Sequence, residues 1–405
     1  MAEKSFNIKS SVVSMRTRNP IRAIVDNLKV KPNPEKEFIS LALGDPTTFG
    51  NFNLHPTCVE AVKKQLDSYK ANGYPPSVGI EPARAAVAKA YTRPEAPLTS
   101  ADIILSSGDA LNLCIGALAN EGQNILLPRP GFSLYETLAS SKGIECRFYN
   151  LDPSRTWEID LDHLQSLIDE NTTAILVNNP SNPCGSVYSK QHLLDILAVA
   201  DKHKLPIISD EIYADMAFKG HEFTPLANLT KTVPILTTSG LAKKYLVPGW
   251  RLGWILIHDR NGAFREIRKG LVNLTQLILG PNSVIQAALP DILSAPQSFY
   301  DETMEQLEKN ANISKKLLSN IPGLHPVFPQ GAMYLMIEID TAQFKDIKDD
   351  VVFVEKLAEE ESVLCLPGQC FRTEGSFVRI VFTPPVEKLD IAYTRIREFA
   401  ARHHI

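Results

Sequence analysis

The sequence predicts an α/β fold in which a large domain, with a mostly parallel sheet sandwiched by helices, is joined to a smaller α+β domain. Three observations support this prediction. Short apolar runs rich in β-branched residues alternate with helix-period segments through the middle of the 405-residue chain, as is typical of sheets covered on both faces. The C-terminal part changes to a long helical segment followed by strands around a helix. Polar motifs directly follow several of the apolar runs, where parallel sheets bind their ligands.

The middle of the chain supplies the strands of the predicted large sheet. The apolar runs that we interpret as strands are residues 103–105, 125–127, 175–177, 206–208, 235–237 and 254–257. Helix-period segments lie between several of them, for example 161–168 and 192–202. Strands that alternate with helices in this way favour a mostly parallel sheet.

The C-terminal part predicts the smaller domain. Residues 299–318 have the apolar spacing of a long helix. Strands are predicted at 333–339 and 377–382, around a helix at 351–361.

The length of the chain favours two to three domains. We expect an N-terminal arm with the first part of the small domain in residues 1–70, a large domain that contains the polar motifs in 71–300 and a small C-terminal domain in 301–405.

Composition and charge narrow the classes of partner. The chain is 44% hydrophobic and 22% charged with a net charge of −4, so neither nucleic acid nor an anionic membrane is expected as a partner. No apolar run has the length of a membrane span.

The six cysteines form no C-x-x-C pair, and no histidines lie beside them at metal spacing. We therefore expect reduced thiols, no metal and a cytoplasmic location. The basic segment 4–22 leaves a mitochondrial presequence as the alternative, although a mobile arm is the favoured interpretation.

Three polar motifs follow predicted strands in sequence order. The turn at Asn182 resembles any Asn-Pro-x-Gly turn, and Asp210, taken alone, is typical of a helix cap. The pair Lys243–Lys244 is by itself typical of a solvated surface. Each motif alone favours a structural interpretation, but their combination and order do not.

In this region the chain resembles the class I and II aminotransferases, which are fold-type-I pyridoxal phosphate enzymes. The pattern G-L-A-K-x-x-L-V-P-G-W-R-L-G runs from Gly240 to Gly253. The resemblance implies that Lys243, rather than Lys244, holds pyridoxal 5'-phosphate as a Schiff base. It also implies that Asp210 pairs with the pyridine nitrogen, so that the ring can accept electrons.

The same resemblance assigns further roles. Tyr213 and Asn182 would bond to the phenolic oxygen of the cofactor, and Arg251 would pair with its phosphate. Arg379, which lies in an apolar strand, would bind the α-carboxylate of the substrate with two hydrogen bonds. A buried arginine is costly without an anionic partner, which supports the last assignment independently.

Three positions outside the lysine region match the family as well. Phe132 stands where the family has an aromatic ring stacked on the cofactor, although a core phenylalanine is the equally weighted alternative. Gly44 matches a glycine beside the substrate carboxylate. Tyr74 matches a tyrosine that reaches the cofactor phosphate of the neighbouring subunit, which implies a homodimer with two composite active sites.

Within the family, long stretches are similar to the branch that acts on tyrosine. They are NPIRAIVDN, GDPTTFGN, NGYPPSVG, PRPGFSLYETLA, NNPSNPCGSV, SDEIYADM and LVPGWRLGWILIHDR. This resemblance implies transamination of an aromatic L-amino acid, with tyrosine as the first choice, and 2-oxoglutarate as the acceptor. The products would be 4-hydroxyphenylpyruvate and glutamate. The side-chain pocket is not identified from the sequence, so alanine or a broad substrate range stays open.

The phosphate loop departs from the family pattern. Ser107 and Gly108 are followed by Asp109, which places a negative charge near the phosphate, and the stretch is short. Either Asp109 points away as a helix cap, or cofactor binding is weakened. Gly240 also stands where several relatives have a serine. These departures keep an inactive relative with little cofactor open as an alternative. A pyridoxal phosphate lyase is the other alternative, because it would share the same catalytic residues.

Overall fold

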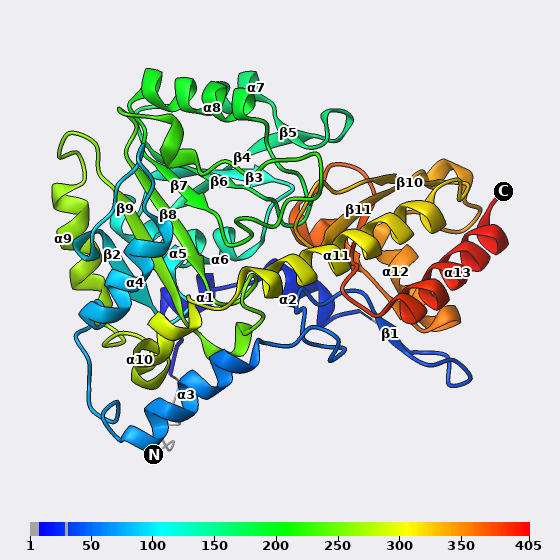
Figure 1. Cartoon of the computed structure of the whole chain (residues 1–405). Coiled ribbons are helices and arrows are strands. Elements are labelled where there is room, and N and C mark those ends of the chain that lie inside the picture. The colour runs from blue at the N-terminus through cyan, green and yellow to red at the C-terminus, as the bar shows by residue number, and fades with distance from the viewer. Residues whose placement is uncertain (1–7, 29–30) are drawn as a thin grey trace, which may run out of the picture.

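A computed structural model of the chain describes residues 8–28 and 31–405. Its main feature is an eight-stranded sheet in the order β2-β9-β8-β7-β6-β3-β4-β5 (Figure 1). The strands are β2 Ile103–Ser106, β3 Asn124–Arg129, β4 Glu145–Asp152, β5 Glu158–Ile159, β6 Thr172–Asn178, β7 Ile207–Asp210, β8 Ile235–Gly240 and β9 Gly253–His258. The five strands from β8 to β4 pair in parallel, whereas β9 and β5 pair antiparallel with their neighbours. The predicted mostly parallel sheet is therefore confirmed.

Helices cover both faces of this sheet. They include α4 Glu81–Tyr91, α5 Ala110–Leu118, α6 Leu134–Ser141, α7 Leu161–Ser166, α8 Lys190–His203, α9 Arg265–Thr275 and α10 Ser283–Ile292. Successive strand residues point to opposite faces, so Ile208 packs with α5, α6 and α9 while its neighbour Ile207 packs with α7 and α8. This division explains why the strands are apolar without alternation.

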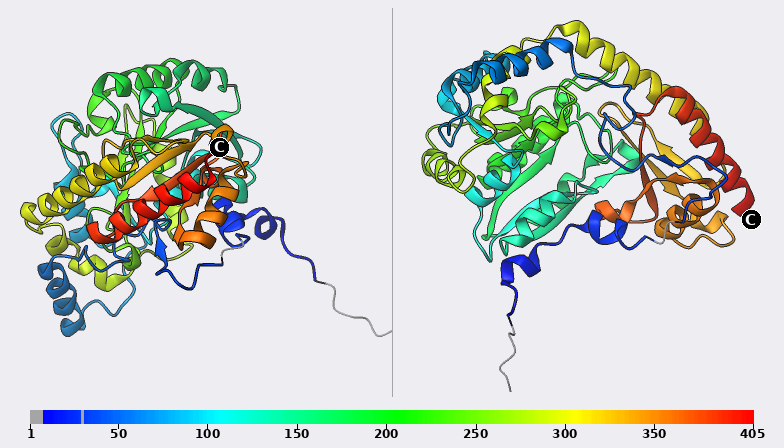
Figure 2. Two further views of the ribbon diagram at one scale, coloured as in Figure 1. Left: turned by 90° about the vertical axis from the view of Figure 1, so that its right-hand side faces the viewer. Right: turned by 90° about the horizontal axis from the view of Figure 1, so that it is seen from below.

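A second, four-stranded antiparallel sheet of order β10-β11-β14-β13 lies beside the first. Its strands are β10 Leu324–Val327, β11 Tyr334–Ile339, β13 Leu366–Pro367 and β14 Phe377–Val381. The helices around it are α11 Gln297–Leu318, α12 Asp350–Glu361 and α13 Val386–His403. The long helix α11 runs from the large sheet to this part of the molecule (Figures 1 and 2). The smaller α+β unit is thus present, whereas the boundaries 71–300 and 301–405 stay a prediction.

Part of the N-terminal segment packs on the C-terminal part. Helices α1 Val12–Arg16, α2 Pro20–Val25 and α3 Pro56–Ser68 lie in this segment, but α1 contacts α6 and α3 contacts α10. Between them, β1 Ile39–Ser40 pairs in parallel with β12 Val363–Leu364. The blue N-terminal chain accordingly runs along the orange and red C-terminal elements (Figure 2). Residues 1–7, and with them the start of the basic segment 4–22, lie outside the described residues.

The predicted elements differ from the structure mainly at edge strands. Strands β4 and β5 are absent from the prediction because they lie at the edge of the sheet, where β4 carries polar and charged residues.

In the described part of the chain, no helix has the length and apolarity of a membrane span. Residues 8–28 and 31–405 also contain no cluster of His, Cys, Asp and Glu side chains suited to a metal ion.

Candidate active site

The candidate site lies at the carboxyl edge of the large sheet. Strands β6, β7 and β8 end side by side, with Asn178 paired in register to Asp210, and Asp210 to Thr238. A cavity of about 400 Å³ opens beyond these ends. Predicted site residues from distant parts of the sequence line it, namely Gly44, Gly108, Phe132, Asn182, Asp210, Tyr213, Lys243, Arg251 and Arg379.

The two consecutive lysines point to different places. Lys243 lines the cavity, where its ammonium group donates to the carbonyl oxygen of Gly44 at 2.5 Å and lies 5.8 Å from the centre of the Tyr213 ring. Lys244 instead forms an ion pair with Asp215 at 2.6 Å and lies over the ring of Tyr300. The two lysines are chemically identical, but only Lys243 faces the cavity.

Asp210 is the acidic group at the floor of the cavity. It is 5% exposed and accepts hydrogen bonds from the hydroxyl of Tyr135 at 2.6 Å and from the amide of Ile212 at 3.3 Å. Burial raises the pKa of Asp210, while these hydrogen bonds and the charge of Lys243 act in the opposite direction. Among the described residues no arginine or lysine forms an ion pair with it, so a cationic N–H of a ligand would be a favourable partner.

Arg379 lies opposite, with its guanidinium almost fully buried. One nitrogen donates to Asn182 Oδ1 at 3.0 Å, another donates to the carbonyl of Ala42, and Nε has no partner in the described chain. The guanidinium also stacks between the rings of Tyr334 and Phe371, at 4.6 and 4.8 Å. No described carboxylate neutralises Arg379, so its charge is available to an anion.

Arg251 faces the turn that precedes α5. It has a left-handed conformation (φ 52°), and its guanidinium lies so close to Gly108 that a Cβ there would be 2.5 Å from Nη2. The first amides of α5 have no helical acceptor, and Gly108, Ala110 and Leu111 line the cavity. A guanidinium beside a helix N-terminus is suited to a phosphate.

The charge of Asp109 is turned away from this place. Asp109 occupies the N-cap position of α5 but makes no side-chain cap bond, so the predicted helix cap is wrong in that detail. Its carboxylate instead accepts a hydrogen bond from the amide of Ser107 at 3.0 Å. The Ser107 hydroxyl donates to the carbonyl of Gly280, and neither side chain lines the cavity. A local turn thus binds the carboxylate that was expected near the phosphate.

Steric crowding between two strands explains why position 240 is a glycine. A Cβ on Gly240 would lie 2.9 Å from both the carbonyl of Leu252 and the Cα of Gly253. Because the backbones of β8 and β9 approach this closely, a serine at position 240 would require them to move apart.

Two of the remaining predictions concern aromatic residues. Phe132 lines the cavity and packs edge-on against Tyr135 at 5.6 Å. Tyr74 is 92% exposed and does not line the cavity of its own chain.

Several residues of the site were not identified from the sequence. Tyr135 bonds to Asp210, Asn178 donates to the carbonyl of Asp210 at 2.9 Å, and Tyr334 shares a 2.6 Å hydrogen bond with Tyr213. The apolar part of the wall includes Ile21, Leu43 and Leu366. These residues reach the site through tertiary packing, and no local sequence signal marks them.

The donor set of the cavity fits pyridoxal phosphate. Arg251 and the α5 amides could hold the phosphate, Asp210 a protonated ring nitrogen, and Lys243 an aldehyde carbon. The unpartnered Nε of Arg379 leaves a donor for a substrate carboxylate. Three cations face one cavity, and none is paired with a described acidic group, which is the arrangement expected for anionic ligands.

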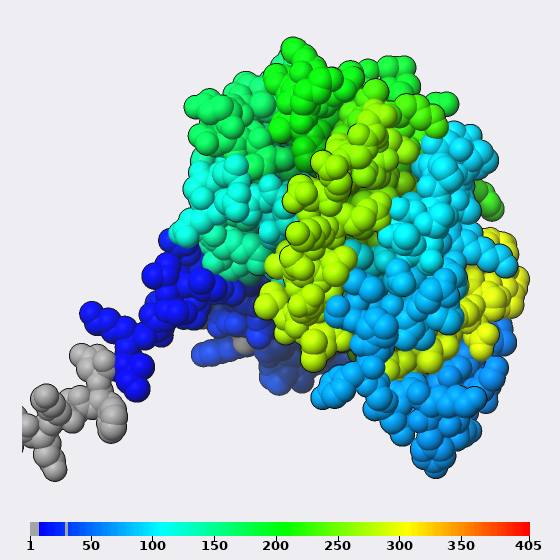
Figure 3. All heavy atoms as spheres, turned by 90° about the vertical axis from the view of Figure 1, so that its left-hand side faces the viewer, coloured from blue at the N-terminus to red at the C-terminus, as the bar shows by residue number. Residues whose placement is uncertain are grey.

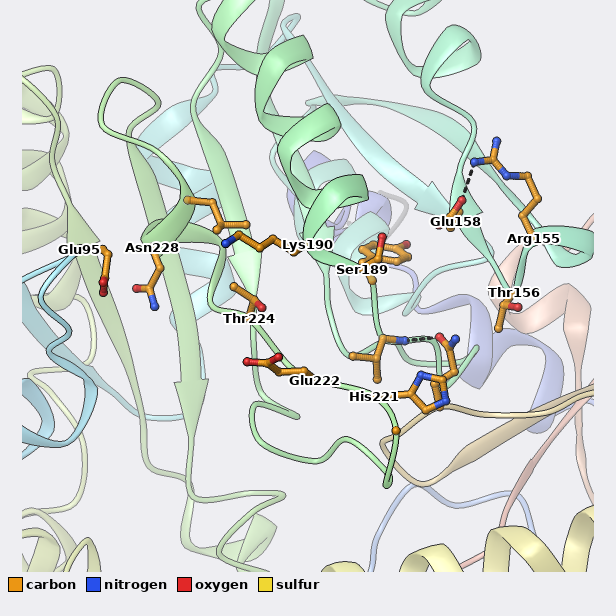
Figure 4. Close-up of a pocket in the computed structure, with 15 residues that line it drawn as sticks. Glu95, Arg155, Thr156, Glu158, Ser189, Lys190, His221, Glu222, Thr224 and Asn228 are labelled. Carbon is orange, nitrogen blue, oxygen red and sulfur yellow. Dashed lines mark hydrogen bonds and ion pairs between the residues drawn. The ribbon is translucent and has the colours of Figure 1, made fainter.

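Another cavity of about 600 Å³ lies near the start of α8 (Figure 4). Its wall contains none of the predicted site residues. Arg155 and Glu158 form an ion pair at 2.6 Å, and Gln330 accepts from the amide of Val187. This cavity therefore lies apart from the residues that the sequence assigns to the site.

Comparisons with known proteins agree with the geometry. Residues 36–396 match the family model described as aminotransferase class I and II. Tyrosine aminotransferase of Mus musculus is 55% identical over 403 residues, covering 98% of this chain and 88% of that protein. The crystal structure of tyrosine aminotransferase from Leishmania infantum superposes with a TM-score of 0.93 at 37% identity, covering 99% of this chain and 100% of that one. An S-alkyl-thiohydroximate lyase of Arabidopsis thaliana is 37% identical, covering 98% of this chain and 86% of that protein.

Proposed function

The chain belongs to the class I and II aminotransferases, and from this membership we propose that it transfers the amino group of an aromatic L-amino acid, tyrosine first, to 2-oxoglutarate. The family depends on pyridoxal phosphate. The observation that carries the proposal is the cavity in which Lys243, Asp210 and Arg379 meet. The products are 4-hydroxyphenylpyruvate and glutamate.

The proposed substrate class is supported by the wall and by the relatives. Phe132, Ile21, Leu43 and Leu366 give the cavity an apolar side, which suits an aromatic ring. The similar proteins of Mus musculus and Leishmania infantum are named for tyrosine. Alanine or a broader range is the alternative.

The cofactor would be held at three points. Asp210 keeps the ring nitrogen protonated, Arg251 with the α5 amides holds the phosphate, and Lys243 forms the covalent link. When bound, pyridoxal phosphate withdraws electrons from the Cα–H bond of the amino acid. The hydroxyl of Tyr213 and the side chain of Asn182 face the same cavity and would donate to the phenolic oxygen.

The chain's own groups then position the substrate and move its proton. Arg379 binds the α-carboxylate, which directs the Cα–H bond toward Lys243. Once the amine of Lys243 is released by the substrate amine, it removes the α-proton as a general base and returns a proton as a general acid. Gly44 contributes a carbonyl that accepts from the Lys243 ammonium in the free enzyme. The second half of the reaction uses the same residues with the 2-oxo acid, which gives ping-pong kinetics.

The proposed assembly is a homodimer with Tyr74 in the neighbour's site. Tyr69, Tyr74, Leu277, Ile278 and Leu279 are each more than half exposed. The α3–α4 segment (blue to cyan) lies beside the yellow-green segment after α9 on one face (Figure 3), and Ser283 donates to the carbonyl of Ala71 between them. Such an exposed apolar group is typical of an interface, and a second copy of the chain is the proposed occupant.

The proposed location is the cytoplasm. All six cysteines are free thiols, and five of them are buried. This is consistent with a reducing compartment.

A lyase on the same fold is the second candidate function. The Arabidopsis thaliana relative named as a lyase favours keeping it. Lyases of this class would use the same lysine and aspartate, so only the product separates the two reactions.

The test is product analysis of the purified protein with tyrosine, 2-oxoglutarate and pyridoxal phosphate. We expect 4-hydroxyphenylpyruvate and glutamate in equal amounts, with parallel lines in double-reciprocal plots. Alanine and a cysteine conjugate serve as comparison substrates. Release of ammonia and pyruvate from the conjugate, without glutamate from tyrosine, would establish the lyase instead.

A further inference from the structure

Tyr334, the first residue of β11, enters the cavity from the small sheet. It is 1% exposed, and its hydroxyl oxygen lies 2.6 Å from that of Tyr213, with the two rings edge-to-face at 5.6 Å. Tyr213 follows β7 of the large sheet. The two hydroxyls therefore join the two sheets inside the site.

Two further groups of the site touch the same side chain. The guanidinium of Arg379 lies 4.6 Å from the centre of the Tyr334 ring, a cation–π distance. On the other side, a Cβ on Gly44 would lie 2.6 Å from the Tyr334 oxygen. Tyr334 thus contacts the residues that we assign to the cofactor oxygen, to the substrate carboxylate and to the carbonyl beside Lys243.

The hydroxyls of Tyr213 and Tyr334 have two donor protons between them. Each tyrosine has one donor proton and two acceptor lone pairs. In the described chain, neither hydroxyl has another hydrogen-bond partner. One proton lies between the two oxygens, so the second proton is free for a ligand in the cavity.

We propose that Tyr334 is a positioning residue whose hydroxyl donates to Tyr213, leaving the Tyr213 proton for the phenolic oxygen of the cofactor, and whose ring aligns Arg379 for the substrate carboxylate. This inference rests on the proposed function. The hydroxyl strengthens the Tyr213 donor because hydrogen bonds in a chain polarise one another. Burial is the main cause that raises the pKa of Tyr213, so Tyr213 keeps its proton at neutral pH.

A simple structural role is the competing explanation. A buried tyrosine in a core packs much as phenylalanine does, and its hydroxyl would then affect only stability. Tyr393 provides the matched control, because it is fully buried in α13 and its hydroxyl bonds to Ser314 at 2.7 Å. Tyr393→Phe removes a hydroxyl of the same kind outside the site.

The experiment is a pH titration of the visible absorption of the bound cofactor in the holoenzyme. For Tyr334→Phe we expect the midpoint to rise by about 0.3–1 pH unit, since a weaker Tyr213 donor favours the protonated form. The KM for the amino acid should stay within about twofold, because phenylalanine keeps the cation–π contact. For Tyr334→Leu we expect the same shift with a KM raised by roughly 2–30-fold.

The outcomes separate this inference from the proposed function. A wild-type midpoint in Tyr334→Phe, or an equal shift in Tyr393→Phe, overturns the role of Tyr334 and leaves the enzyme assignment intact. Absence of any cofactor band in the wild type overturns both. Thermal melting of the cofactor-free variants checks folding, and a loss of structure confined to Tyr334→Phe would also contradict a role limited to positioning.

Discussion

The hydroxyl of Tyr135 donates a 2.6 Å hydrogen bond to the buried carboxylate of Asp210. Tyr135 lies in α6 and Asp210 at the end of β7, so the contact joins a covering helix to the floor of the site. The hydrogen bond stabilises the ionised carboxylate against the cost of burial. The charge that would hold a protonated ring nitrogen thus depends on a residue outside the lysine pattern of residues 240–253.

Tyr135→Phe is expected to weaken cofactor binding. Loss of a hydrogen bond to a charged group costs roughly 1.5–3 kcal/mol, so the Kd for pyridoxal phosphate should rise about 10–150-fold. Fluorescence titration of the cofactor-free protein measures this value. Tyr149→Phe is the control, since Tyr149 is equally buried but donates to the neutral carbonyl of Leu176 at 2.7 Å. Equal effects of the two substitutions would contradict the role of Asp210.

The carboxyl group of Glu211 predicts a pH dependence of stability. Burial is the main cause that raises its pKa from 4.5 to about 7. The folded state binds the proton of Glu211 more tightly than the unfolded state does. The stabilisation from this protonation is therefore fully present below pH 4.5 and is lost as the pH rises through 7. The corresponding loss in the free energy of unfolding is about 3 kcal/mol.

Denaturant unfolding of the cofactor-free protein at pH 5 and pH 7.5 measures this effect. The difference in the free energy of unfolding should be smaller in Glu211→Gln, which keeps an acceptor for Ser209 and for the Leu226 amide. Glu222→Gln, at an exposed position, should behave as the wild type. An unchanged pH profile in Glu211→Gln would show that Glu211 does not titrate in this range.

Gly44 and Tyr334 should be energetically coupled. In Gly44→Ala the new methyl group meets the Tyr334 oxygen at 2.6 Å, whereas the ring carbons are 3.3 Å or more away. We expect overpacking to cost about 1–3 kcal/mol and Tyr334→Phe to recover part of it. Denaturant unfolding of the two single variants and the double variant gives the coupling free energy. Additive effects would contradict the contact.

The proposed composite site, with Tyr74 in the neighbour's site, predicts complementation between subunits. Lys243→Ala subunits and Tyr74→Ala subunits should each have little activity as homodimers. After unfolding and refolding of a mixture, a hybrid dimer contains one site with an intact Lys243 and an intact Tyr74 from the other chain. Tyrosine-dependent activity should therefore return in the mixture. If Tyr74 acted within its own chain, every hybrid site would have a defect and no activity would return.

The sequence predicts the large sheet and the small α+β unit because their strands are buried and apolar. It also predicts most of the charged groups of the cavity, since they follow strands that end at one edge. Strand β4, which lies next to the edge strand β5, is not predicted because its polar residues lack that pattern. Tyr135 and Tyr334 could not be predicted, because their contacts with Asp210 and Tyr213 arise only when α6 and β11 pack onto β7.

The pattern around Lys243 already selects Lys243 over Lys244, and the structure adds where each side chain points and how Asp109 is oriented. Lys243 and Lys244 are the same residue type in adjacent positions, and only the turn after β8 directs one into the cavity and the other to Asp215. The carboxylate of Asp109 binds the Ser107 amide, a local bond that competes with helix capping.

The assignment of Lys243 as the cofactor-binding lysine is tested most directly by the visible absorption spectrum of the purified protein with pyridoxal phosphate, before and after addition of tyrosine, alongside Lys243→Ala and Lys244→Ala. We expect a yellow absorption band in the wild type and in Lys244→Ala that bleaches when tyrosine is added, and no such band in Lys243→Ala. Absence of the band in the wild type with excess cofactor, or its persistence in Lys243→Ala, would contradict the assignment of this cavity as the active site.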